Sequence, residues 1–179
     1  MLYGTKTLAM RPEQARIMAL YNRWMNERLY EVCAELPDEE RKRDRRVFFG
    51  SIHGTLNHLL LGDKVWLGRF QGKPFHARSL DQELYEDFSE LQAEREVTDQ
   101  RIETWAAGLT DEVLSSKFHF TSMVNPAPRT YGMWIAVTHF FNHQTHHRGQ
   151  LTALLSQCGK DYGVTDLIWL PELSPEGAK

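Results

Sequence analysis

The chain has little of what marks secreted, membrane-spanning or disulfide-stabilised proteins. Only two of its 179 residues are cysteines, Cys33 and Cys158, and we expect both to be free thiols buried late in helices. No apolar run approaches the ~20 residues that a membrane span needs, and the N-terminus lacks a basic segment followed by an apolar one. The sequence therefore predicts a cytoplasmic protein without a membrane partner.

The chain also lacks an excess of positive charge. Its formal net charge is −3 and its isoelectric point is about 6.2, so no basic surface indicates a nucleic-acid partner. The one basic run, residues 41–46, directly follows the acidic residues 38–40. We expect this mixed segment to be a solvated loop between helices.

Strand patterns are scarce, and four segments carry apolar residues at steps of three and four, which is the helical period. Pro12 opens the first, Ser51 is a plausible N-cap of the second, and Asp87 begins a capping-box pattern for the third. The predicted helices lie at about residues 12–36, 52–70, 88–109 and 130–157.

These elements predict an all-α fold, an antiparallel-type four-helix bundle formed by one domain over residues 1–179. The connection between the third and fourth helices is long enough for a crossover. Within it, Lys117–Thr121 alternates enough to allow a short strand or hairpin. Residues 161–173 are expected to pack back as coil or a short turn.

Histidines are concentrated on the fourth predicted helix, where four of the eight lie within nine positions. His143 and His147 are four residues apart, as are His139 and His143, so either pair stacks on one helix face. Neutral imidazole nitrogen binds zinc, nickel, copper and iron. We favour His143 with His147, because the adjacent Gly149 predicts a tightly packed part of the bundle.

A third ligand must come from another helix, and His58 is the best candidate because small, polar residues surround it on its helix face. The less favoured His139 and His146 are expected near the pocket. Asn142 and Thr145 could orient a ligand ring through its second nitrogen. The histidines expected on the surface or in loops are His53, His76 and His119.

Two charged residues, Asp63 and Arg95, interrupt apolar stripes of the second and third helices. Because a buried charge needs a partner, either they pair across the two helices or Asp63 fixes another polar group. The alternative is that both charges reach water at a helix edge. Position 144 is glutamine, so the glutamate base of a His-Glu-x-x-His metalloprotease is absent. The fourth helix also lacks the Glu-x-x-His pattern of di-iron bundles.

Three stretches of the chain resemble the DinB/YfiT-like superfamily. They are Tyr21–Asn26, Ser51–Trp66 and Asn142–Gln150, the last with a specific His-Arg-Gly-Gln ending. The resemblance implies a four-helix bundle with a three-histidine site for a divalent metal, commonly zinc or nickel. By motif position the ligands fall on His58, His143 and His147. It further implies a homodimer and, from relatives in the wider superfamily, transfer chemistry on a small-molecule thiol. It does not imply DNA binding.

Three hypotheses follow for the function. Three histidines leave a coordination position open, which favours a metal-dependent enzyme, either a thiol-dependent transferase or a hydrolase. The second hypothesis is a non-enzymatic metal-binding or stress-response protein. In the third, the chain is an ordinary helical dimer whose histidines are incidental.

Overall fold

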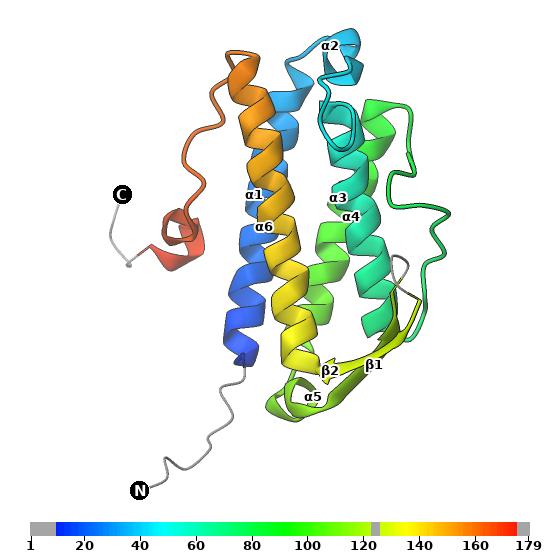
Figure 1. Cartoon of the computed structure of the whole chain (residues 1–179). Coiled ribbons are helices and arrows are strands. Elements are labelled where there is room, and N and C mark those ends of the chain that lie inside the picture. Colours follow the sequence, from blue (N-terminus) through cyan, green and yellow to red (C-terminus); the bar gives the residue numbers. More distant parts are fainter. Residues whose placement is uncertain (1–9, 123–125, 175–179) are drawn as a thin grey trace, which may run out of the picture.

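Four long helices form a bundle in the computed structural model, which describes residues 10–122 and 126–174 (Figure 1). The long helices are α1 (Pro12–Ala34), α3 (Ile52–Phe70), α4 (Phe88–Ala107) and α6 (Met133–Gln157). The short elements are α2 (Asp38–Lys42), α5 (Asp111–Ser115), strands β1 (Lys117–Thr121) and β2 (Pro128–Gly132), and two 3₁₀ turns at Leu167–Trp169 and Pro171–Leu173. The predicted helical bundle is confirmed, and the pattern at residues 117–121 is one strand of a hairpin.

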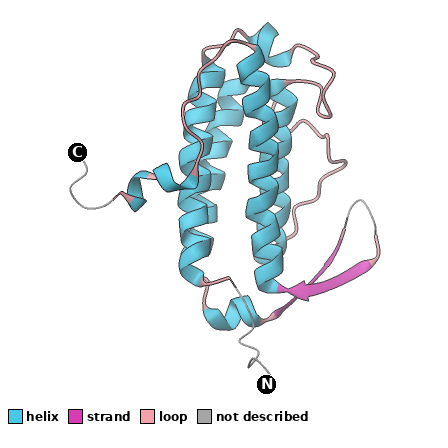
Figure 2. Cartoon of the chain, turned by 60° about the vertical axis from the view of Figure 1, so that its left-hand side comes forward, coloured by secondary structure: helices cyan, strands magenta, loops and turns pink. Residues whose placement is uncertain are grey.

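The helices α1 and α6 run in one direction and α3 and α4 in the other (Figure 1). Each helix of the diagonal pair α1 and α3 packs against both α4 and α6. The α1–α4 and α3–α6 contacts are therefore antiparallel, whereas α3–α4 and α1–α6 are parallel. Residues 71–87 return along the side of the bundle as loop (Figure 2), so the connection that runs the length of the bundle joins α3 to α4. The link carrying α5 and the hairpin stays at one end of the bundle (Figure 1), which corrects the expectation of a crossover there.

The predicted caps are present, and one helix boundary differs. Ser51 Oγ accepts from the backbone N–H of Gly54 at 2.9 Å, and Asp87 Oδ1 accepts from that of Glu90 at 3.0 Å. Helix α6 begins at Met133 rather than near residue 130. The reason is that the preceding residues pair with β1 in an antiparallel ladder, and this tertiary pairing overrides the helical pattern.

A polar layer lies between two apolar clusters in the core and links all four long helices. Arg95 Nη1 lies 2.6 Å from Asp63 Oδ2, and Arg95 Nη2 lies 2.8 Å from Asp99 Oδ1. This confirms the pairing of Asp63 with Arg95, and both side chains are buried, so the alternative in which they reach water is wrong. Four further buried side chains complete the layer. Asn22 and Asn26 donate to Asp99, and Gln144 donates to Asp63. Arg148 donates to Asn22.

The basic run is not solvated throughout, which corrects the sequence interpretation. Arg41 donates to the carbonyls of Cys33 and Leu36, and Arg45 lies 3.0 Å from a carboxylate oxygen of Glu40. Their side chains are only 11% and 14% exposed. The carbonyls at the end of α1 have no partner within the helix, so the Arg41 guanidinium satisfies groups that charge patterning alone does not reveal.

Both cysteines are free thiols, but only Cys33 is buried, while Cys158 is half-buried at the end of α6. Burial raises the pKa of the Cys33 thiol to about 12, so this thiol stays protonated at neutral pH. None of the helices in the described ranges combines the length and the hydropathy needed to cross a bilayer.

Candidate metal centre

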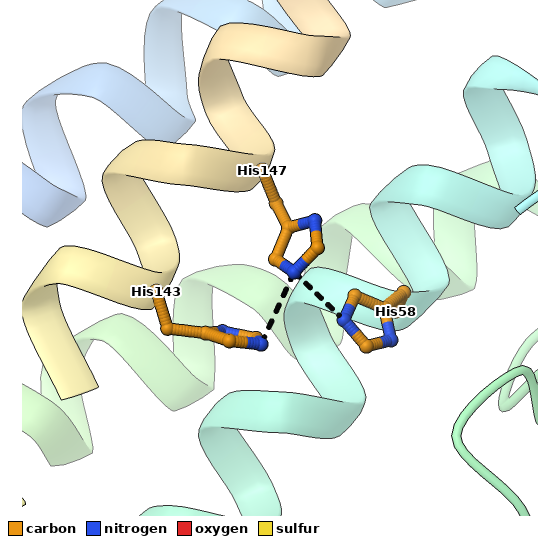
Figure 3. A group of neighbouring side chains, drawn as sticks. All are labelled: His58, His143 and His147. Atoms are coloured by element: carbon orange, nitrogen blue, oxygen red, sulfur yellow. Dashed lines mark hydrogen bonds between the residues drawn. The ribbon is translucent and has the colours of Figure 1, made fainter. Parts of the chain in front are cut away.

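Three histidine side chains converge between α3 and α6, and their ring nitrogens face a common point (Figure 3). His147 Nε2 lies 3.2 Å from His58 Nε2 and 3.1 Å from His143 Nε2. The antiparallel packing of the two helices sets His58 opposite His147, one turn from His143. These are the three residues that the sequence singled out as ligands, and each offers one nitrogen to a group spanning at most 4.8 Å.

In two of the three rings, the hydrogen bond at Nδ1 fixes which ring nitrogen carries the proton. His58 Nδ1 lies 2.8 Å from the carbonyl oxygen of Leu80, and His147 Nδ1 lies 2.8 Å from Oε1 of Gln150. Both partners are acceptors, so each Nδ1 must carry the proton and each neutral ring presents a bare lone pair at Nε2. Two such acceptors 3.2 Å apart cannot hydrogen-bond to each other, and a cation between them would remove their repulsion.

Burial keeps these rings neutral. It lowers the pKa of His58 to about 4 against the opposing effect of the Leu80 carbonyl, and it lowers the pKa of His143 to about 3, with the neighbouring histidines acting in the same direction. The pKa of His147 is also lowered by burial, although the bond to Gln150 raises it. A proton is therefore a poor bridging cation at neutral pH, and the donor set fits a metal ion.

Two of the three nitrogen separations also fit one small divalent ion. Metal–nitrogen bonds of ~2.0–2.1 Å place two ligand nitrogens ~3.4 Å apart in tetrahedral geometry and ~2.9 Å apart at right angles. The two observed separations of 3.1 and 3.2 Å lie between these values. Zinc, nickel and other ions that accept imidazole satisfy this spacing equally.

The carbonyl that orients His58 comes from the long segment 71–87, and Asn57 holds that segment on α3. Asn57 Oδ1 accepts from the backbone N–H groups of Leu84 and Tyr85 at 2.8 and 3.0 Å, and its Nδ2 donates to the Tyr85 carbonyl at 3.0 Å. Sequence analysis missed this residue. A buried asparagine beside a ligand histidine was the available signal, because its amide can replace two missing backbone partners.

The same segment overturns the expectation for His53, which is buried rather than on the surface. Its side chain is 2% exposed, and Nε2 lies 2.9 Å from the Tyr85 carbonyl and 3.0 Å from a Glu83 oxygen. His53 lies five residues before His58, ~140° around the helix, and residues 71–87 cover that face. His76 and His119 are exposed, as expected.

Phe49 and Gly62 shape the space around the three rings. The Phe49 ring stacks on His58 with centroids 3.7 Å apart and meets His147 edge-on at 5.4 Å. A Cβ added at Gly62 would lie 3.1 Å from His143 Cε1. The tight glycine is therefore Gly62, and the prediction for Gly149 is wrong, because Gly149 faces open space.

The prediction that Asn142 and Thr145 orient a histidine ring is also wrong. Asn142 is exposed, and Thr145 Oγ1 donates to the Phe141 carbonyl one turn back rather than to a histidine. Gln150 performs that role for His147. A buried Nδ1 of His143 has no partner among the described residues.

A cavity of about 530 Å³ opens directly beside His58 and His143 and extends toward the hairpin. His139 lines it, in contact with the Trp66 ring at 4.9 Å between centroids, and burial lowers the pKa of His139. His146 is exposed next to Gln150 and does not line the cavity. The structure thus separates the two less favoured histidines, because only His139 faces the cavity.

Comparisons with known proteins agree with this architecture. The model of the DinB family matches residues 10–178. The protein named Protein DinB of Bacillus subtilis (strain 168) is 28% identical over 151 residues, which cover 82% of this chain and 87% of that protein. A crystal structure of a DinB-like protein from Bacillus cereus ATCC 10987 superposes with a TM-score of 0.56 at 18% identity, over 79% of this chain and 90% of the other. At that identity the structural match shows the fold alone.

Proposed function

Because the chain belongs to the DinB family, we propose that His58, His143 and His147 hold one divalent metal ion, zinc or nickel before others. The observation that carries this proposal is the contact between Nε2 atoms at 3.1 and 3.2 Å. Two of the rings are already fixed as acceptors by partners on Nδ1, so a cation resolves their repulsion. This arrangement is pre-organised for a ligand set rather than for hydrogen bonds between rings.

The proposed activity is that of a metal-dependent enzyme, a transferase using a small-molecule thiol or a hydrolase using water. Three protein ligands leave a position open, where an ion lowers the pKa of a thiol or water and polarises a carbonyl. The site has no thiol of its own, because neither cysteine lines the cavity and Cys33 is buried and protonated. A thiol nucleophile must therefore come from solution.

The cavity also contains no carboxylate among its described lining residues, and of the side chains that do line it, histidine is the one that accepts a proton at neutral pH. His139 is the one that fits, because it lines the cavity and its lowered pKa keeps it neutral at pH 7. We assign it the role of proton acceptor from the incoming thiol or water.

A homodimer, which the family resemblance implies, remains a prediction that size-exclusion chromatography with light scattering can check.

The first test is metal content by elemental mass spectrometry on untagged protein. We expect about one ion per chain in the wild type and a loss of at least 90% in His58→Ala, since two histidines of one helix hold an ion far more weakly than three. His119→Ala is the matched control, because His119 is exposed on β1 and should change nothing. Full metal content in His58→Ala would refute the ligand assignment.

The outcome also separates the enzymatic proposal from its alternative. If metal is present and a screen of thiol-transfer and ester substrates gives turnover that His139→Gln reduces, the enzymatic proposal stands. If chelation lowers the melting temperature strongly and no substrate turns over, the ion serves to join α3 to α6 in a non-enzymatic protein. Absence of metal even after supplementation would leave a helical protein with incidental histidines.

A second prediction concerns Gly62, which touches a ligand without binding the ion. Valine at this position would push the His143 ring aside, because even its Cβ would lie 3.1 Å from Cε1. We expect Gly62→Val to weaken metal binding roughly 10- to 100-fold, measured by competition with a chromophoric chelator. Gly149→Val is the control, since it makes the same change at an α6 position with open space around it; equal losses in both variants would contradict the prediction.

A further inference from the structure

The cavity that begins at the histidine site ends at two arginines near the hairpin. Between these ends its walls are mainly apolar. The lining residues are His58 and His143 at one end, Arg69 and Arg129 at the other, and between them such residues as Leu61, Val65, Trp66 and Ile135. The site therefore has one coordinating end, an apolar middle and one cationic end.

Arg69, in the last turn of α3, is held as a flat cation against aromatic rings. Its guanidinium carbon lies 5.0 Å from the Trp66 ring centre and 5.2 Å from that of Phe120, and its Nη2 donates to the Thr121 carbonyl at 3.3 Å. Burial lowers the pKa of Arg69, but an arginine remains charged at neutral pH. No carboxylate of the described residues forms a salt bridge with it.

Arg129, half-buried on β2, is the second cation that lines this part of the cavity. Its Nη1 lies 3.3 Å from the phenolic oxygen of Tyr131, and it has no ion-pair partner within the described ranges. The sequence explains why, since no aspartate or glutamate occurs between Glu112 and Asp161. The whole hairpin and α6 thus contribute no negative charge, although the chain is acidic overall.

Several cations elsewhere in the described chain have acidic partners: Lys64 contacts Glu94, and Arg95 contacts Asp63 and Asp99. Arg28 and Arg148 form no ion pair either, but they donate to oxygens of the protein itself, whereas Arg69 and Arg129 both line an open cavity. A partly desolvated cation is stabilised by an anion. In a cavity with two such cations and no internal anion, the missing partner is a group that the ligand brings.

We propose that the cavity binds small molecules that join an apolar body to a carboxylate, with the carboxylate at Arg69 and Arg129. The apolar body would lie along Trp66 and Ile135, and the end remote from the carboxylate would face His58 and His143. Gly62 and Arg69 are seven residues apart on one helix, which is ~10 Å at 1.5 Å per residue. A single aromatic ring with a short acyl chain spans that length.

This inference names the substrate class of the proposed enzyme, but the recognition itself needs no metal. The test therefore uses chelator-treated protein and two probes of the same shape, 4-phenylbutyrate and its neutral amide, 4-phenylbutyramide. Isothermal titration calorimetry gives Kd for each probe. We expect the carboxylate to bind at least roughly tenfold more tightly than the amide, since a charge-assisted bond replaces a neutral one.

Arginine variants locate the binding site. Arg69→Gln and Arg129→Gln should each raise the Kd of phenylbutyrate about tenfold or more and leave that of the amide nearly unchanged. Arg101→Gln, an exposed position on α4 outside the cavity, is the matched control. Circular dichroism checks that each variant is folded. Arg129 lies on the surface strand β2, so Arg129→Gln still tests the inference if Arg69→Gln unfolds.

Three results would overturn the inference: equal affinity for acid and amide, equal effects of the cavity and control arginine variants, or no binding of the acid at millimolar concentration. Failure of the metal proposal is seen separately. If the untreated protein holds no metal even after supplementation, while the chelator-treated protein prefers the acid through Arg69 and Arg129, the recognition site is supported and the metal-dependent reaction is rejected.

Discussion

Replacing Asp63 with alanine is expected to lower the free energy of unfolding by about 3–5 kcal/mol. The Asp63 side chain is 0% exposed and lies 2.6 Å from Arg95, whose own side chain is 2% exposed. Removing this carboxylate would leave the buried guanidinium groups of Arg95 and Arg148 with Asp99 as the only described anion in the layer. Urea denaturation followed by circular dichroism measures the loss.

The control is Asp81→Ala, which removes the same side chain from an exposed position in the 71–87 segment and should change stability by no more than ~0.5 kcal/mol. A loss below about 1 kcal/mol for Asp63→Ala would show that the polar layer carries little net stability. Removing both partners, in Asp63→Leu with Arg95→Met, should cost less than the sum of the single changes. In this double variant the buried layer keeps one negative charge, on Asp99, and one positive charge, on Arg148.

The sequence was informative about this polar layer and about the three clustered histidines for the same physical reason. Asp63 and Arg95 stood out because each breaks an apolar stripe, and a buried charge has few solutions other than an opposite charge. His143 and His147 stood out because a spacing of four fixes two side chains on one helix face. His58 could be chosen because its helix face is small and polar. Local periodicity thus predicted the bundle and the three ring positions.

What surrounds the rings could not be predicted, because it depends on segments without periodicity. The Leu80 carbonyl that orients His58 belongs to a loop, and every residue has a carbonyl, so no side-chain pattern marks it. The burial of His53 follows from the same loop. Phe49, which stacks on His58, precedes the helix by a turn whose path is set by the left-handed conformation of Gly50 at φ 71°.

Gly62 and Gly149 show that the free-energy cost of a glycine within a helix does not by itself locate close packing. A glycine within a helix is costly, and this indicated close packing at Gly149, but the penalty does not say which glycine has a neighbour. Gly62 has one because α6 sets His143 against it. Only the rotation of both helices about their axes, which the buried polar layer and the apolar clusters determine together, distinguishes the two positions.

Lowering the pH from 8 to 6 is expected to weaken metal binding by less than about threefold. Protons compete with an ion for imidazole only when the folded protein takes them up. Three imidazoles with an ordinary pKa of 6.5 would all be neutral in only ~1 of 70 molecules at pH 6. Burial lowers the pKa of His58 to about 4 and that of His143 to about 3, and it also lowers the pKa of His147, so protons should compete far less at pH 6 than they would with three ordinary imidazoles.

Competition with a chelator of known proton affinity, at pH values from 8 to 4.5, gives this dependence directly. The informative variant is Phe49→Ala, because the Phe49 ring covers His58 at 3.7 Å between centroids, and its removal admits water to the site. The pKa of His58 should then rise toward its ordinary value, and affinity should decline more steeply between pH 7 and 6 than in the wild type.

A fall of roughly 70-fold in wild-type affinity by pH 6 would mean that the rings titrate as free imidazoles. In that case burial does not keep the site neutral, and the cation between the Nε2 atoms would be a proton as readily as a metal.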